Sequence, residues 1–154
     1  VLEIDSRKAR FDACLILMAL HRLTPEEMGP AVPEIATLQL RYGNYLDRMD
    51  RPEAAETVYG RALEFLQRVE TPRAWHYLRI ARYYRRTGKA DEALNVLLEG
   101  IRKLPKSAGL HLVAAVYYEN LGIYYRAIEE YRQTLLLAPD NKRARTRLER
   151  LENR

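Results

Sequence analysis

The sequence predicts an all-α fold in which antiparallel helix pairs stack into a solenoid, with an extra N-terminal helix and a C-terminal capping helix. Three observations predict it. The 154 residues are 47% hydrophobic and 31% charged but include only 7 Gly and 7 Pro, which disfavours disorder and loop-rich β folds. Small, aromatic and Pro positions recur at one fixed spacing along the second half of the chain. Apolar residues between these positions recur with helical periodicity.

The repeat is clearest in residues 74–107 and 108–141. Gly88 and Gly122 occupy the same place in the two units, and each unit therefore carries one central turn. Four further pairs have the same separation as these two glycines: Ala81 and Ala115, Tyr84 and Tyr118, Ala93 and Ala127, Pro105 and Pro139. Each unit is thus predicted to form a helix, a turn and a second helix.

The stretch RRTGKADEAL, residues 85–94, is predicted to be the turn between two such helices. The preceding helix carries one apolar and aromatic face with i, i+3, i+4, i+7 spacing, made of Tyr77, Ile80, Ala81 and Tyr84. Gly88 suits the left-handed conformation at a helix end, and Pro105 ends the second helix. A phosphate-binding loop is excluded, because Tyr83 and Ala90 stand where it needs Gly and Ser or Thr.

This pattern resembles the tetratricopeptide repeat family. In the first helix of the unit, Ala81 and Tyr84 match the family's small residue and Tyr. In the second helix, Ala93 matches the family's Ala, and Pro105 matches its closing Pro. Their counterparts in the next unit match in the same way. The resemblance implies a superhelical stack in which the first helix of each pair lines a concave surface. Related repeats serve chaperones, secretion systems and regulatory scaffolds, so the resemblance identifies no biological process.

The flanking segments complete the expected single domain of residues 1–154. Residues 36–67 are an earlier copy, in which Asp50 replaces the turn Gly. Residues 1–30 are either half of a preceding repeat or an unrelated packing helix. Residues 142–154 have six basic and two acidic side chains and are predicted to form the capping helix. They place Ala144, Leu148 and Leu151 on a narrow apolar stripe that can dock on the preceding helix.

The outward side of the first helices is the candidate peptide-binding groove. In residues 74–86, Arg79, Arg82 and Arg86 form a basic stripe with Trp75 one turn ahead. Such a groove suits a peptide or helix with acidic and apolar side chains, since Arg forks bind carboxylates bidentately. The predicted groove consists of Arg41, Asn44, Arg48, Trp75, Arg79, Arg82, Arg86, Leu112, Val116 and Asn120, with Leu40 and Val113 at equivalent positions.

A carboxylate clamp of the kind found in some family members is disfavoured. Asn44 fits such a clamp, but Leu40 stands in place of its Lys, and Gly109 and Val113 stand in place of two basic residues. The alternative to any groove function is that the arginines form a solvated face with local ion pairs.

No enzyme, metal site or cofactor is predicted. The three His lie in different elements without metal-ligand spacing, and His111 falls at an inward position where it is expected to pack. Carboxylates such as Glu129 and Glu130 are expected at exposed faces. Six of the eleven Tyr are assigned to the core, which leaves Tyr83, Tyr117, Tyr124 and Tyr125 as the candidates for exposure.

Three functions stay open. The first is a protein-interaction scaffold that binds a protein or peptide. The second is nucleic-acid binding, which the balance of acidic and basic residues outside the tail disfavours. The third is self-association through the ends of the stack. No apolar run approaches the roughly 20 residues of a membrane span, and the single Cys14 leaves the cellular compartment open.

Two features of the sequence bear on its source. It starts at Val1 with neither an initiator Met nor a signal-peptide pattern, so we expect it to be part of a larger protein. Arg outnumbers Lys by 21 to 5, which is typical of GC-rich coding sequences and favours a bacterial source.

Overall fold

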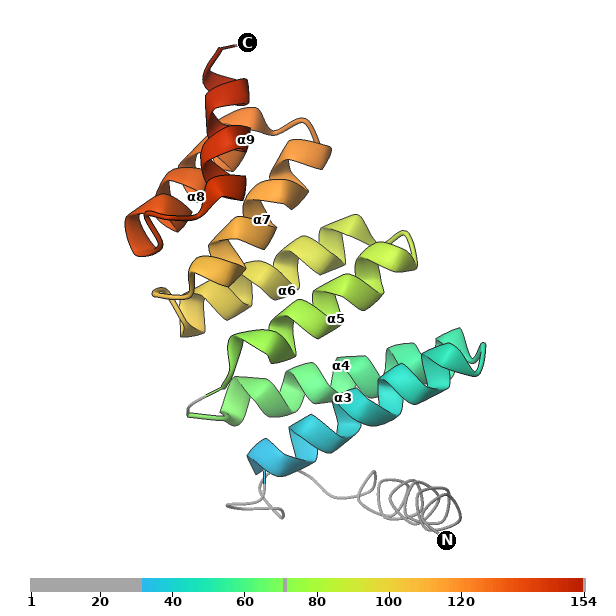
Figure 1. Ribbon diagram of the computed structural model, residues 1–154. Coiled ribbons are helices and arrows are strands. Elements are labelled where there is room, and N and C mark those ends of the chain that lie inside the picture. Colours follow the sequence, from blue (N-terminus) through green and yellow to red (C-terminus); the bar gives the residue numbers. More distant parts are fainter. Residues whose placement is uncertain (1–31, 71, 154) are drawn as a thin grey trace, which may run out of the picture. The chain divides into compact units, whose positions relative to one another are not determined.

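The computed structural model describes residues 32–70 and 72–153, and every regular element within these ranges is an α-helix (Figure 1). The helices are α3 (Val32–Arg48), α4 (Pro52–Arg68), α5 (Ala74–Arg86), α6 (Ala90–Lys103), α7 (Ala108–Asn120), α8 (Tyr124–Leu137) and α9 (Lys142–Glu152). The predicted all-α fold of antiparallel helix pairs is confirmed. The helix expected within residues 1–30 lies outside the described residues.

The chain divides into two compact units, residues 1–71 and 72–154. In the first unit, α3 packs against α4. In the second unit, α5 packs against α6, α6 against α7, α7 against α8 and α8 against α9, and α5 also contacts α7 (Figure 1). The candidate site described below is built from α5, α7 and α9 of the second unit.

The turns within the helix pairs share one backbone conformation. Gly88 and Gly122 have φ angles of 80° and 75°, and Asp50 has a φ of 56°. Glycine adopts this left-handed region without steric cost, and Asp tolerates it better than most residues. Asp50 therefore occupies the turn position that the sequence alignment gave it.

Small residues let the two helices of a pair approach closely. Gly100 of α6 packs on Tyr77 of α5, where an added Cβ would lie 2.8 Å from Tyr77 Cγ. In the first unit an added Cβ on Gly43 of α3 would lie 3.1 Å from the ring of Tyr59. Both tyrosines are buried, so each ring fills space that the missing side chain leaves open.

Helix α9 covers the end of the second unit. Asn141 caps it, with its side-chain oxygen accepting a hydrogen bond from the Ala144 N–H at 3.0 Å. The predicted stripe of Ala144, Leu148 and Leu151 is buried in one cluster with Ala115, Ala127 and Tyr131 of α7 and α8. The expected capping helix is therefore confirmed.

Two expectations about burial were wrong. Tyr83 and Tyr117 are only 3% and 6% exposed, although the sequence left them outside the core. Each lies two residues after a fully buried Ala, Ala81 or Ala115, so the helix is buried on a second side as well. For Tyr117 that side faces α5, where its hydroxyl reaches the Ala81 carbonyl. Leu40 is fully buried as well, so it belongs to the core of the first unit and not to a groove.

Candidate functional site

Helix α5 begins at a reciprocal pair of hydrogen bonds. The His76 N–H donates to the Arg73 carbonyl at 3.0 Å, and the Arg73 N–H donates to His76 Nδ1 at 3.2 Å. Because Nδ1 accepts a hydrogen bond, it carries no proton. Burial, helped by the charge of Arg73, lowers the pKa of His76 to about 4, so the ring is neutral at physiological pH. Trp75 projects from this first turn and is 36% exposed.

The outward side of α5 carries two cations that lack carboxylate partners within the described ranges. Arg82 is exposed and Arg79 is half-buried, and neither forms an ion pair with any residue in those ranges. Arg86 is exposed and lies with its guanidinium carbon 5.9 Å from the Tyr83 ring centroid. The predicted basic stripe therefore lies on the solvent side of α5.

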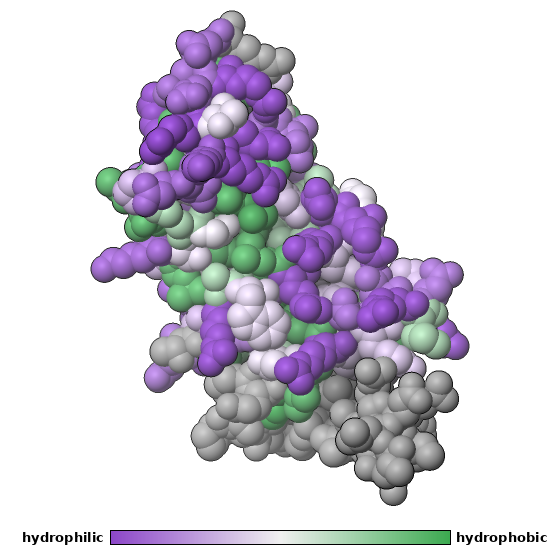
Figure 2. Space-filling model, in the orientation of Figure 1, coloured by the Kyte–Doolittle hydropathy of each residue, from purple (hydrophilic) through white to green (hydrophobic). Residues whose placement is uncertain are grey.

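The neighbouring helix α7 presents apolar side chains beside these cations. Leu112 and Val116 are half-buried and pack against the cluster that joins α7, α8 and α9. Asn120 is exposed at the end of α7. Figure 2 shows hydrophobic residues gathered along α7 and towards α5, with hydrophilic residues over α9 and over the C-terminal part of α5. We call Trp75, Arg79, Arg82, Arg86, Leu112, Val116 and Asn120 the α5–α7 face.

A buried carboxylate joins α9 to this part of the structure. Glu119 of α7 has a side chain only 11% exposed. Its Oε2 accepts hydrogen bonds from Tyr131 Oη at 2.7 Å and from Arg147 Nη1 at 2.8 Å. Its Oε1 is paired with the exposed Arg150. Arg147 and Arg150 of α9 thus share one carboxylate, whereas Arg79 and Arg82 have none among the described residues.

The same carboxylate borders an open cleft of about 320 Å³. Its lining consists of Glu119, Asn120, Tyr124, Arg150 and Leu151. Burial would raise the pKa of Glu119, but hydrogen bonds from Tyr131 and Arg147 outweigh it, and the pKa lies below its usual value. The carboxylate is therefore ionised and committed to its donors, which makes it a structural group rather than a catalytic acid.

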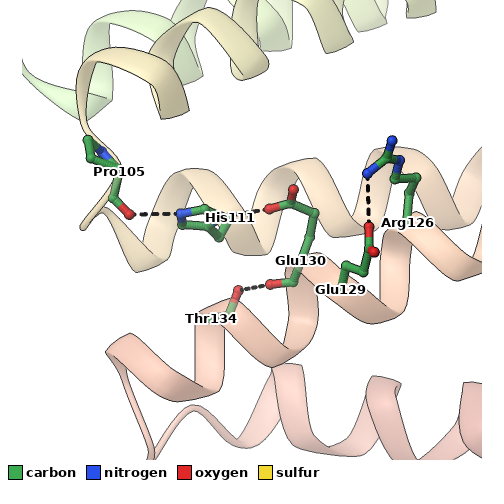
Figure 3. A network of polar contacts seen from close by, with 6 residues as sticks. All are labelled: Pro105, His111, Arg126, Glu129, Glu130 and Thr134. Atoms are coloured by element: carbon green, nitrogen blue, oxygen red, sulfur yellow. Dashed lines mark hydrogen bonds and ion pairs between the residues drawn. The ribbon is translucent and has the colours of Figure 1, made fainter.

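His111 is a structural histidine, as the sequence indicated. Nδ1 lies 2.6 Å from Glu130 Oε2 of α8, and Nε2 lies 2.9 Å from the Pro105 carbonyl oxygen (Figure 3). Thr134 adds a hydrogen bond to the Glu130 carbonyl at 2.9 Å. Glu130 was expected at an exposed face, but its side chain is only 18% exposed because it reaches back to His111 of the preceding helix.

The remaining groove residues belong to the first unit. On α3, Arg41 and Arg48 are exposed and Asn44 is half-buried, and none of the three forms an ion pair with the described residues. Their participation in the predicted groove stays a prediction.

None of the helices in residues 32–70 and 72–153 is both long and apolar enough to cross a membrane. Within the same described ranges, no three His, Cys, Asp or Glu side chains gather closely enough to hold a metal ion.

Two functional features were missed in the sequence. Arg85 of α5 reaches α7, with its guanidinium carbon 5.9 Å from the Tyr117 ring centroid, and its i, i+3 spacing from Arg82 was the available signal. The second missed feature is Glu119 of α7. Its three donors come from α8 and α9, so no local pattern could have identified it.

Comparison with known proteins identifies the repeats. Residues 34–106 match the model of the tetratricopeptide repeat family. No curated protein sequence matches the chain. Among solved structures, the Arabidopsis OM64 TPR domain has a TM-score of 0.63 and 20% identity, over 79% of this chain and 98% of that one. The first TPR of Spaghetti (RPAP3) bound to the HSP90 peptide SRMEEVD has a TM-score of 0.64 and 16% identity, over 79% of this chain and 93% of that one. MamA has a TM-score of 0.63 and 18% identity, over 97% of this chain and 82% of that one.

Proposed function

Because residues 34–106 belong to the tetratricopeptide repeat family, we propose that this chain is a protein-interaction module whose α5–α7 face binds a peptide or helical segment of a partner protein. The observation that carries the proposal is the juxtaposition of two unpaired cations with an apolar strip. Arg79 and Arg82 lack ion-pair partners among the described residues, and Leu112 and Val116 on the adjacent helix remain partly exposed.

The chemistry of this face favours a ligand with both acidic and apolar side chains. An apolar side chain placed on Leu112 and Val116 gains about 25 cal/mol for each Å² removed from water. A carboxylate placed on Arg79 or Arg82 gains charge-assisted hydrogen bonds without breaking an existing ion pair. The structurally similar RPAP3 domain binds the peptide SRMEEVD, which also combines acidic residues with apolar ones. Asn120 extends the contact at one end of the face.

Nucleic-acid binding receives less support. Single-stranded nucleic acids stack on several exposed aromatic rings beside the cations. Trp75 of the α5–α7 face is 36% exposed, but Tyr83 and Tyr117 are buried and cannot extend a stacking surface from it. Arg147 and Arg150 of α9 share the carboxylate of Glu119, which offsets one of their two positive charges.

The proposal is tested by selecting ligands from a displayed library of random peptides. The bait is the whole chain, and the counter-bait is the Arg79→Glu/Arg82→Glu variant with unchanged helicity by circular dichroism. A Lys142→Glu/Arg143→Glu variant is the matched control, because it makes the same charge change at two exposed α9 residues.

We expect enrichment of peptides that combine Asp or Glu with large apolar residues. These peptides should bind the control variant as well as the unaltered chain and lose binding to the Arg79→Glu/Arg82→Glu variant. The proposal is wrong if no peptide is enriched, or if the enriched peptides bind all three proteins equally.

A further inference from the structure

Tyr117 is the point at which α5 and α7 are joined. Its hydroxyl donates a hydrogen bond to the Ala81 carbonyl at 3.1 Å, between residues far apart in the sequence. The side chain is almost completely buried. The hydroxyl is therefore committed to the fold and is not free to bind a ligand, but the ring forms a fixed platform between the two helices.

Arg85 of α5 contacts this platform, and Arg82 lies three residues earlier on the same helix. The guanidinium carbon of Arg85 lies 5.9 Å from the ring centroid, within the range of a cation–π contact. Burial raises the pKa of Tyr117, and the positive charges of Arg85 and Arg82 partly oppose that rise. Both guanidinium groups thus lie close enough to the same tyrosine to act on it electrostatically.

No carboxylate of the described residues neutralises this pair. Arg82 and Arg85 are both exposed, and neither forms an ion pair with a residue in the described part of the chain. Other arginines of the same unit do: Arg126 pairs with Glu129, Arg132 with Glu152, and Arg147 with Glu119. Residues three apart are neighbours on the surface of a helix, so an anion that reaches Arg82 and Arg85 would be attracted by both charges.

We propose that Arg82 and Arg85 form an oxyanion-binding notch on the Tyr117 ring, which receives one carboxylate- or phosphate-bearing side chain of the peptide bound to the α5–α7 face. This inference rests on the proposed function and specifies it, because it assigns the acidic residue of the ligand to one position. The contact of Arg85 with the ring limits the motion of one guanidinium before the ligand arrives. Two planar forks can donate four or more hydrogen bonds to one oxyanion.

The notch is tested first without any peptide. Sodium phosphate and sodium acetate are titrated separately into the whole chain at constant ionic strength, with sodium chloride as balance, and the arginine side-chain Nε–H signals are recorded by NMR. We expect saturable shifts at Arg82 and Arg85 and none at Arg143, an exposed arginine of α9. The anion that saturates at the lower concentration identifies the ligand side chain as carboxylate or phosphate. Equal shifts at all exposed arginines, or none at Arg82 and Arg85, overturn the inference.

The second test uses an acidic peptide recovered from the library. The Arg82→Gln/Arg85→Gln variant should weaken binding about tenfold or more, since each charge-assisted contact is worth roughly a factor of ten. The matched Lys142→Gln/Arg143→Gln variant should change it less than about twofold. Arg85→Lys should give an intermediate loss, because it keeps the charge without the planar fork. Equal affinity of the Arg82→Gln/Arg85→Gln variant and the unaltered chain would overturn the notch.

The two proposals fail in different ways. If peptides bind the face but the Arg82→Gln/Arg85→Gln variant binds them equally well, the notch is wrong and the proposed function stands. If no peptide is selected but phosphate or acetate saturates Arg82 and Arg85, the anion site stands and the proposed function is wrong.

Discussion

Replacing Glu119 with Ala is expected to release α9 from the rest of the second unit. Glu119 accepts hydrogen bonds from Tyr131 at 2.7 Å and from Arg147 at 2.8 Å, and it is paired with Arg150. The two hydrogen bonds reach a carboxylate that is 11% exposed, and bonds to charged groups contribute about 1.5–3 kcal/mol each in such positions. Arg150 is 62% exposed, so its pair adds no more than about 0.5 kcal/mol.

Because Arg147 is itself partly exposed, we expect a total loss of about 3 kcal/mol, which corresponds to roughly a hundredfold easier opening of α9. Amide hydrogen exchange of α9 measures this opening directly. The matched control is Glu152→Gln, which removes an ion pair to Arg132 whose partners are 63% and 40% exposed. It should change exchange by less than about threefold.

The pH dependence of α9 docking follows from the same carboxylate. The pKa of Glu119 in the folded chain is below its usual value of 4.5, so the folded state favours the ionised form. The stability that the Glu119 carboxylate gives to α9 docking is therefore present above pH 4.5 and is lost as the pH falls through the lower pKa of the folded state.

If Glu119→Ala accelerates amide exchange of α9 no more than Glu152→Gln does, the carboxylate does not hold the helix and this explanation of α9 docking is wrong.

Three further outcomes are expected. Gly100→Ala should lower the free energy of unfolding by about 1–3 kcal/mol, because the added Cβ would lie 2.8 Å from the Tyr77 side chain. Gly60→Ala should raise the free energy of unfolding by up to about 1 kcal/mol, because its added Cβ would meet no atom within 4 Å. Urea unfolding would contradict this reasoning if both substitutions changed the stability in the same direction. The pKa of His76 is lowered to about 4, so the stability that its neutral ring contributes is lost as the pH falls from 6.5 towards 4. His76→Gln should therefore make the free energy of unfolding less dependent on pH in that window. An unchanged dependence on pH would contradict the neutral ring. Peptide affinity should fall steeply with salt if unpaired arginines bind the ligand, and an affinity independent of salt would argue for apolar contacts alone.

The helices themselves could be predicted from the sequence because their determinants are local and repeated. Apolar spacing, turn glycines and closing prolines recur from one unit to the next, and each feature acts within its own helix pair. Asp50 shows how far this extends, since the alignment placed it at the turn position of Gly88 and the structure gives it the same left-handed conformation.

The site could be predicted only in part, because side-chain partners come from other elements. The stripe of Arg79 and Arg82 was visible as helical spacing. The contact of Arg85 with Tyr117 depends on how closely α5 and α7 approach, which the sequence does not state. Tyr117 was left outside the predicted core for the same reason, since its burial depends on neighbouring elements and not on its own periodicity.

The most direct test of the central claim is an NMR map of a selected acidic peptide on the whole chain. Binding to the α5–α7 face predicts shifts at the arginine side chains of Arg79 and Arg82 and at the methyl groups of Leu112 and Val116. Shifts confined to α6 and α8, for example at the exposed Leu98 and Leu136, would show that the peptide binds elsewhere and would contradict the claim.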